Sequence, residues 1–272
     1  MTSTRASDLR SRFLDLHTAP AAAPTPGILV MPNPWDVGSA KLLAHIGAVA
    51  LATTSAGHAG SYGRLDQNVQ RDELLAHVAE MTAAVDVPFN VDSEDCFGAD
   101  EAGVAETAAL LAETDAAGFS IEDFDPRVGG IRPIGIAAAR VSAAKRAAGD
   151  LVLTARAENH LHGVDDLNDT VRRLEAYRDA GADVVYAPGP VRPADIERLV
   201  DVGAPLNVLA MPGTPTVPEL AELGVSRVSV GSLFAWAAYG ALVDAATELL
   251  GPGTSVYTES LLDGATRDAA FG

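Results

Sequence analysis

Three stretches of the chain decide its fold: PFNVDSED at residues 88–95, GFSIEDFD at 118–125 and LVLTARAE at 151–158. Each begins as a short apolar run typical of a buried parallel strand, and each becomes charged where that strand should end. They recur about every thirty residues, the length of one strand, one helix and two loops. Because the carboxyl ends of the strands of a (β/α)8 barrel meet at one mouth, the pattern predicts such a barrel with a charged mouth.

The same alternation continues along the chain. Seven amphipathic helical stretches and a longer final helix are expected between and after the strands. Eight such units predict a closed (β/α)8 TIM barrel of the α/β class rather than an open doubly wound sheet. The strands are expected at 28–31, 49–53, 89–91, 119–121, 152–155, 184–186, 206–210 and 227–230, and the helices at 39–46, 71–85, 101–116, 136–148, 167–180, 194–202, 218–223 and 233–250.

The length of the chain fits one barrel. It has 272 residues, and a (β/α)8 barrel takes about 250. The segment APAAAPTPG at 19–27 is a low-complexity lead-in, and no linker divides the rest. We therefore expect one barrel domain over residues 1–272, with a C-terminal helical extension from about residue 252.

The helix expected at 233–250 is apolar almost all round, with Leu233, Phe234, Trp236 and Leu242 spread over its faces. A helix of this kind must be buried on more than one side. One barrel wall covers only one side, so a second subunit is the expected cover. The sequence therefore predicts a homo-oligomer with this helix at the interface.

Charge and cysteine content exclude several classes of protein. The formal net charge of −18 argues against nucleic acid and anionic membrane surfaces, which require clustered Lys and Arg. The N-terminal segment lacks the apolar core of a signal peptide, and no run approaches the 18 or so apolar residues of a membrane span. The single cysteine, Cys96, excludes an intrachain disulfide and fits a reducing cytoplasm. A small anionic substrate would have to be received by a metal ion or by arginine.

Carboxylates collect at the ends of two neighbouring strands. Asp92 and Glu94 follow the strand at 89–91 and point to the same side if the strand continues through them, since side chains alternate. Glu122 ends the next strand. Three carboxylates at one mouth repel one another unless a cation lies between them, and Mg²⁺ or Mn²⁺ suits all-oxygen ligands. We predict a metal site formed by Asp92, Glu94 and Glu122; the alternative is helix capping or surface ion pairing.

Arginines supply the candidate anion ligands. Arg156 ends the fifth strand, where a guanidinium can grip a carboxylate or phosphonate with two parallel hydrogen bonds; its alternative role is to balance nearby glutamates. The loop at 123–133, DFDPRVGGIRP, is longer than a barrel needs. Its glycine pair and its two arginines predict a mobile flap that carries Arg127 and Arg132 over a bound anion. The alternative is a plain surface loop.

Other chemistries have less support in the residues. Lys41 and Lys145 both fall within expected helices, which argues against a Schiff-base aldolase. His160 and His162 have the H-x-H spacing of a zinc site without an evident third ligand, and ordinary surface histidines are the alternative. Cys96 has no local histidine to activate it and is expected to be a buried packing residue.

Five motifs follow one another along the chain: PNPWDVGSAKLL at 32–43, ALATTSAGHA at 50–59, NVDSEDCFG at 90–98, GFSIED at 118–123 and LTARAE at 153–158. In this order they resemble the isocitrate lyase / phosphoenolpyruvate mutase superfamily over most of the chain. The resemblance implies a barrel whose last helix is exchanged between neighbouring subunits, assembly into a tetramer as a dimer of dimers, Mg²⁺ dependence, and 2-oxo or 2-hydroxy acid substrates.

The same resemblance implies roles for individual residues. Asp92 and Glu94 match the acid pair of the metal site, and Glu122 matches the acid after the fourth strand. Asp66 matches a further acidic residue near the metal, and Arg156 the anion-binding arginine. The matched catalytic residues are thus Asp66, Glu122 and Arg156. Thr54 or Ser55 matches the residue whose hydroxyl and backbone N–H hold the substrate carboxylate.

The flap departs from the family pattern. Lyases of the family carry K-[KR]-C-G-H there, and mutases and phosphonopyruvate hydrolases carry a lysine and an asparagine; this chain has DPRVGGIRP at 125–133. The histidine expected after the sixth strand of the phosphonate enzymes is replaced by the region 186–188. The group that donates or removes a proton is therefore not identified by the sequence.

The resulting hypothesis is a Mg²⁺-dependent C–C bond lyase or hydrolase. It would act on a small 2-oxo acid or related dicarboxylate through an enolate-like intermediate, whose charge a divalent cation stabilises. One alternative is a phosphonopyruvate-type enzyme, a mutase or hydrolase, that cleaves P–C bonds. Another is a non-catalytic 2-oxo acid binder.

Overall fold

The eight expected strands form one barrel sheet. The computed structural model describes residues 4–18 and 27–272, so the expected lead-in at 19–27 lies outside the described residues except for Gly27. The parallel strands run in the order β1-β10-β9-β8-β7-β4-β3-β2, and the Ala52 N–H donates to the Pro32 carbonyl at 3.1 Å across the remaining seam. The predicted (β/α)8 TIM barrel is confirmed. Its strands are β1 (Leu29–Met31), β2 (Leu51–Ala52), β3 (Phe89–Asp92), β4 (Gly118–Glu122), β7 (Val152–Arg156), β8 (Val184–Tyr186), β9 (Leu206–Leu209) and β10 (Arg227–Ser229).

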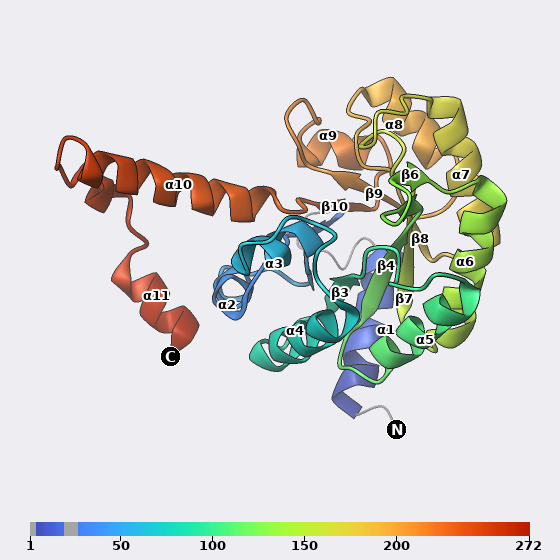
Figure 1. The fold of residues 1–272 in the computed structure, drawn as a ribbon, viewed down its shortest axis with the longest axis horizontal. Helices are drawn as coiled ribbons and strands as arrows, with labels where there is room; N and C mark the ends of the chain where they lie inside the picture. The colour runs from blue at the N-terminus through green and yellow to red at the C-terminus, as the bar shows by residue number, and fades with distance from the viewer. Residues whose placement is uncertain (1–3, 19–26) are drawn as a thin grey trace.

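Helices cover the outer face of this sheet (Figure 1). Several begin at an aspartate whose side chain accepts a backbone N–H three residues on, as at Asp36, Asp100 and Asp166. The helix expected to run to residue 116 ends earlier, at Ala112. The helices that follow strands are α2 (Val37–His45), α3 (Ser55–Ser61), α4 (Arg71–Ala84), α5 (Glu101–Ala112), α6 (Ile134–Ala147), α7 (Leu167–Asp179), α8 (Pro193–Val200), α9 (Val217–Glu222) and α10 (Leu233–Leu250).

A helix that the sequence analysis missed, α1 (Thr4–Thr18), covers the amino-terminal end of the barrel. Its Phe13 is fully buried against the inner side chains Leu29 and Val152. A Cβ on Gly118, the first residue of β4, would come within 2.8 Å of the Phe13 ring, so glycine at this position admits the ring. The mouth at the carboxyl ends of the strands is left as the open end of the barrel.

The two long loops contain regular structure. The loop at 54–70 includes α3, a short helix whose N-cap is Thr54. The predicted flap at 123–133 folds as an antiparallel hairpin of β5 (Phe124–Asp125) and β6 (Gly130–Ile131). In this structure the segment is therefore an ordered hairpin rather than an irregular loop.

After the eighth strand the chain leaves the barrel. Figure 1 shows α10 projecting away from the sheet, and α11 (Gly264–Phe271) returns beside α2. Within α10 Ala235 is buried, whereas Trp236, Leu242 and Val243 are exposed. The C-terminal extension expected from about residue 252 begins with a 3-10 helix, η2 (Val256–Ser260). The C-terminal extension is thus helical, and α10 presents an uncovered apolar surface.

Within the described residues, α10 is the one helix that is long and apolar enough to cross a membrane, with a mean hydropathy of 1.3 over 18 residues. The expectation that no run approaches the length of a span was therefore wrong. Length and composition alone are weak evidence for a span, and Asp244 and Glu248 interrupt the apolar surface of this helix.

Below the mouth, α1 contributes a buried histidine to the barrel interior. His17 Nδ1 lies 2.7 Å from the Phe13 carbonyl, and its Nε2 lies 3.2 Å from Nη1 of Arg227 on β10. Burial and the Arg227 charge lower the pKa of His17 to about 3. His17 is therefore neutral in the folded protein, with Nε2 accepting from the arginine.

This histidine should make the fold sensitive to acid. Between about pH 6.5 and pH 3 the unfolded chain binds a proton at His17 and the folded chain does not, so stability falls as pH falls through that window. The free energy of unfolding of the wild-type protein should fall between about pH 7 and pH 4.5. In His17→Gln we expect this fall to be smaller than in wild type by about 2 kcal/mol. Urea denaturation at both pH values measures it, with the exposed His45→Gln as control. Equal losses in His17→Gln and wild type would contradict this account.

Candidate active site

Arg156 faces three carboxylates at the barrel mouth. Its Nη1 is 2.7 Å from Asp92 Oδ1, its Nε donates to Glu158 Oε1 at 2.8 Å, and its Nη2 is 3.5 Å from Glu122 Oε2. The register of the sheet produces this arrangement, because Glu122 pairs with Arg156 across β4 and β7. The guanidinium also lies 5.4 Å from the centroid of the Tyr186 ring. The expected convergence of charged strand ends is thus present.

The charges in this group are strongly interdependent. Burial alone would lower the pKa of Arg156, but Glu158, Asp92 and Glu122 outweigh it and raise that pKa well above its usual value. Burial raises the pKa of Glu122 well above its ordinary range, with Arg156 opposing the shift. Burial likewise raises the pKa of Glu158. One permanent cation is therefore shared among three carboxyl groups, of which Glu122 and Glu158 hold their protons more tightly than usual.

Asp92 is held by β2 and α3 as well as by Arg156. Its backbone N–H donates to Thr53 Oγ1 at 2.8 Å, and its Oδ2 accepts the Ser55 N–H at 3.0 Å. Thr54 Oγ1 accepts the Gly57 N–H at 3.3 Å and so caps α3. The Ser55 amide, which the sequence analysis assigned to a substrate carboxylate, thus holds a protein carboxylate in this structure.

Glu94 reaches its position by leaving the strand. β3 ends at Asp92, and Glu94 has a left-handed backbone with φ 50°, so the strand does not continue through both residues, which was the condition for aiming their side chains to the same side. The side chain is buried. Burial, together with Asp92, Asp66 and Asp95 nearby, raises the pKa of Glu94 to about 8. Glu94 is therefore part of the same crowded set of acids.

The loop between α3 and α4 brings two more side chains to the mouth. The surrounding protein and the Asp92 charge raise the pKa of Asp66, as expected for an acid close to the cluster. Gln67, which the sequence analysis did not single out, donates from Nε2 to Glu122 Oε1 at 2.9 Å. Gln67 has a left-handed backbone with φ 63°, a feature of functional loops that one sequence does not reveal.

The donor set fits a hard divalent cation by its chemistry. Asp92, Glu94, Glu122 and Asp66 offer oxygen ligands only, and burial together with the neighbouring acids raises the pKa of Asp66, Glu94 and Glu122. Among the residues that the structure describes, no three His, Cys, Asp or Glu side chains are grouped closely enough to hold an ion as they stand. A bound metal ion would therefore have to bring these oxygens closer together. Its positive charge would then neutralise part of the carboxylate charge that Arg156 neutralises in this structure.

A polar cavity of about 60 Å³ lies in the barrel directly below Asp92 and Arg156. On its floor Arg227 is fully buried, and burial lowers its pKa to about 9. Arg227 donates to Asn207 Oδ1 at 2.8 Å and to Thr154 Oγ1 at 3.0 Å. Other wall residues are Asn90, Ser120 and Ser229. The barrel interior is thus polar below the mouth, whereas such interiors are usually filled with branched apolar side chains.

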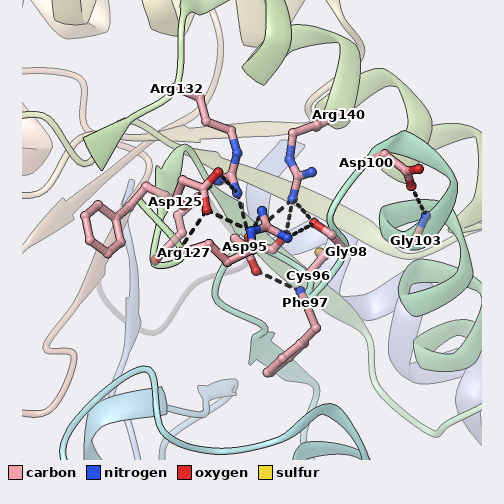
Figure 2. Close-up of polar contacts among 12 residues, drawn as sticks. Asp95, Cys96, Phe97, Gly98, Asp100, Gly103, Asp125, Arg127, Arg132 and Arg140 are labelled. Atoms are coloured by element: carbon pink, nitrogen blue, oxygen red, sulfur yellow. Dashed lines mark hydrogen bonds and ion pairs between the residues drawn. The ribbon is translucent and has the colours of Figure 1, made fainter. Parts of the chain in front are cut away.

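The two arginines of the predicted flap lie away from this group. Arg127 Nη2 and Arg132 Nη2 are 3.2 Å and 2.7 Å from Asp95 Oδ2, and a third arginine, Arg140 of α6, joins them. Figure 2 shows the three guanidinium groups converging on Asp95. In this structure neither flap arginine is presented to the mouth, and their predicted contact with substrate stays a prediction. Arg140 and the role of Asp95 were not found from the sequence.

The remaining candidates have structural partners. His160 Nε2 is 2.8 Å from Thr170 Oγ1, and the His162 ring stacks on Phe124 with centroids 3.8 Å apart. Cys96 is fully buried as expected, and burial raises the pKa of its thiol to about 12. These observations give no support to a zinc site or a thiolate nucleophile at these residues.

Sequence relatives place the chain in a family. The family model described as phosphoenolpyruvate phosphomutase matches residues 15–250. An uncharacterised protein of Mycobacterium tuberculosis is 33% identical over 212 residues, which covers 75% of this chain and 78% of that protein. The 2-methylisocitrate lyase of Bacillus subtilis is 29% identical, over 66% of this chain and 59% of its own. The oxaloacetate decarboxylase of Paraburkholderia xenovorans is 32% identical, over 59% and 55%.

Solved structures agree with this placement. A Burkholderia cenocepacia protein provisionally assigned as a lyase/mutase is 45% identical and superposes with a TM-score of 0.92, covering 99% of this chain and 98% of that one. Phosphonopyruvate hydrolase, solved in complex with oxalate and Mg²⁺, is 22% identical with a TM-score of 0.81 over 98% and 94%, and this likeness shows the fold alone. The chain belongs to the phosphoenolpyruvate mutase / isocitrate lyase superfamily and is an enzyme of this superfamily.

Proposed function

We propose that the enzyme cleaves a C–C bond in a small 2-oxo acid or related dicarboxylate with the help of Mg²⁺ or Mn²⁺. The observation that carries the proposal is the arrangement around Arg156: one guanidinium shared by Asp92, Glu122 and Glu158 at the mouth of the barrel. A site of this kind can exchange a protein carboxylate for a substrate carboxylate on the arginine. Relatives named 2-methylisocitrate lyase and oxaloacetate decarboxylase support a substrate of this class.

In this proposal each residue of the mouth has a distinct task. Asp92, Glu94 and Glu122 would hold the cation, which when bound supplies Lewis-acid stabilisation of the negative charge that develops as the bond breaks. Arg156 would turn from Asp92 to an anionic group of the substrate and grip it with two hydrogen bonds. Asp66 would lie beside the cation and hold a proton during the reaction.

Other chain atoms would orient the substrate and keep its surroundings polar. The hydroxyl of Thr54 or Ser55 and the Ser55 N–H would bind its carboxylate once Asp92 has turned to the cation. Gln67 donates to Oε1 of Glu122, the oxygen that Arg156 leaves free. The hairpin at 123–133 would shield the reacting groups from water. Its arginines, Arg127 and Arg132, are proposed substrate ligands only in a state in which they are released from Asp95.

A phosphonopyruvate-type reaction is the second candidate. The match to a family model described as phosphoenolpyruvate phosphomutase favours it. A purified-enzyme panel of oxaloacetate, 2,3-dimethylmalate and phosphonopyruvate, each with Mg²⁺ and with EDTA, separates the two. We expect metal-dependent release of pyruvate or oxalate from a C–C substrate. Release of phosphate from phosphonopyruvate alone would reject the first proposal in favour of the second.

Asp92→Ala should abolish Mg²⁺ binding and leave the fold intact, because Asp92 lies at the mouth and Arg156 keeps Glu158 as a partner. Calorimetric titration measures the affinity, and thermal melting reports the fold. Glu175→Ala, on the exposed side of α7, is the matched control. If Asp92→Ala binds Mg²⁺ with wild-type affinity, Asp92 is not a ligand of the metal.

Arg156→Lys should weaken oxalate binding in the presence of Mg²⁺ by about tenfold or more, since lysine keeps the charge and loses the planar fork. Titration calorimetry against oxalate tests this, with the exposed Arg172→Lys as control. If the variant binds oxalate as tightly as wild type, Arg156 balances the carboxylates of the mouth and does not bind substrate.

We also propose that the enzyme is one barrel domain over residues 1–272, with an extension from about residue 252, and works in the cytoplasm as a homo-oligomer. We propose a tetramer built as a dimer of dimers in which α10 is exchanged between subunits. The uncovered side chains of α10 support this, because an exposed helix with Leu242 at 65% and Val243 at 61% accessibility would otherwise place apolar surface in water.

The assembly can be measured directly. Light scattering at micromolar concentration should give a multiple of the 28.0 kDa chain mass. Leu242→Glu combined with Val243→Glu should lower that mass, because charges would be buried against a neighbouring subunit. A monodisperse wild-type species at the chain mass would contradict both the oligomer and the helix exchange.

A further inference from the structure

One buried carboxylate, that of Asp95, receives three arginines from separate parts of the chain. Its Oδ2 is 3.2 Å from Arg127 Nη2, 2.7 Å from Arg132 Nη2 and 3.4 Å from Arg140 Nη2. Arg127 lies in the turn of the β5–β6 hairpin, Arg132 follows β6, and Arg140 lies in α6. Asp95, Arg132 and Arg140 are buried. We call Asp95 and these three arginines the Asp95 cluster (Figure 2).

The same arginines also bind the main chain of the acidic loop at 93–98. Arg140 Nη2 donates to the Asp95 carbonyl at 2.7 Å and to the Gly98 carbonyl at 2.9 Å, and Arg127 Nη1 donates to the Gly98 carbonyl at 2.9 Å. On the hairpin side, Arg132 Nη1 donates to the Phe124 carbonyl. The Asp95 cluster therefore joins two segments: the loop that carries Glu94 and the hairpin at 124–131.

The acidic loop is strained and needs such support. Glu94, Cys96 and Phe97 have φ values of 50°, 59° and 55°, in the left-handed region that residues with a side chain seldom adopt. Conformations of this kind persist where surrounding contacts over-determine them. The Phe97 N–H donates to Asp95 Oδ1 at 2.9 Å, so the central carboxylate also fixes the backbone of the strained turn.

Charge balance makes Asp95 the critical member. Asp125 is the second acid of the cluster, 2.9 Å from Arg127 Nε and 3.1 Å from Arg132 Nη2. Two carboxylates thus face three guanidinium groups. Without the Asp95 charge, Arg132 and Arg140 would be buried close together with too little negative charge, and leaving a buried charge without its partner is strongly destabilising. The simplest relief is for the hairpin to move off the loop with its arginines.

From this geometry we propose that Asp95 is a positioning residue: it fastens the β5–β6 hairpin to the acidic loop, so that the hairpin and the Glu94 carboxylate keep one arrangement together. Neither Asp95 nor the arginines need touch substrate or metal for this role. The fastening itself is independent of the proposed function. Its consequence for metal binding rests on the proposed function, in which Glu94 is a ligand.

Hydrogen exchange on the metal-free full-length protein tests the fastening. In Asp95→Asn, which keeps the shape and removes the charge, we expect exchange to rise about tenfold or more in peptides covering both 92–98 and 124–132. Arg132→Gln should raise it in the same two peptides. Arg146→Gln is the matched control, because this exposed arginine of α6 contacts Ser142 and lies outside the cluster. Unchanged exchange in the hairpin of Asp95→Asn would overturn the proposal.

Two further variants keep the test decisive. If Asp95→Asn does not fold, Arg127→Gln removes a half-exposed member and should still raise exchange in both peptides. In the double variant Asp95→Asn/Arg132→Gln, the change should be smaller than the sum of the single changes, since each single change breaks the same interaction. Additive effects, or a rise in one peptide only, would show that loop and hairpin are held separately and would contradict the proposal.

Calorimetric titration with Mg²⁺ tests whether the contacts of Asp95 affect metal binding. Asp95→Asn should bind Mg²⁺ about tenfold or more weakly than wild type, while Arg146→Gln should bind it normally. If wild type binds Mg²⁺ and Asp95→Asn binds it equally well, the link from Asp95 to Glu94 is wrong. If wild type binds no Mg²⁺, the proposed Mg²⁺ dependence is wrong. The hydrogen-exchange measurement alone then still decides whether Asp95 fastens the hairpin to the acidic loop.

Discussion

The interaction on which the mouth depends is that of the Arg156 guanidinium with Asp92, Glu122 and Glu158. Parallel strands bring their carboxyl ends to one place, and this chain ends two of them in acids, Asp92 of β3 and Glu122 of β4, while β7 ends at Arg156 with Glu158 two residues on. Without a cation, such a group could exist only with most of its acids protonated. Arg156 allows the acids to stay together before any ligand arrives, and it keeps them ready for exchange with a divalent ion and an anionic substrate.

The barrel is organised in layers that support this charged mouth. Phe13 and Leu16 of α1 close the amino-terminal end with apolar contacts. Above them lies a polar layer around Arg227, and the charged residues follow at the mouth. Beside the mouth, Asp95 holds the hairpin and the acidic loop together. A change at a residue that need not touch substrate or metal, such as Asp95 or His17 of α1, which contacts Arg227, therefore reaches the site through packing and charge.

Much of the fold could be predicted from the sequence, because strands with charged ends repeat at the spacing of a strand and a helix. Asp92, Glu122 and Arg156 could be placed for the same reason, since each directly ends a strand.

The orientation of Glu94 could not be predicted, because its left-handed backbone breaks the alternation of side chains along the strand. Arg127 and Arg132 were assigned to substrate, but their partner Asp95 lies more than thirty residues away in sequence, a pairing that spacing does not reveal. α1 was missed although Leu9, Phe13 and Leu16 follow a helical spacing, because the segment was read only for a signal peptide.

The most direct test of the account is a crystal structure of the enzyme with Mg²⁺ and oxalate. The account predicts an ion bound to oxygens of Asp92, Glu94 and Glu122, with Arg156 turned from Asp92 onto the oxalate. The contradicting result is a mouth without the ion in which Arg156 keeps its 2.7 Å contact with Asp92 and oxalate binds elsewhere.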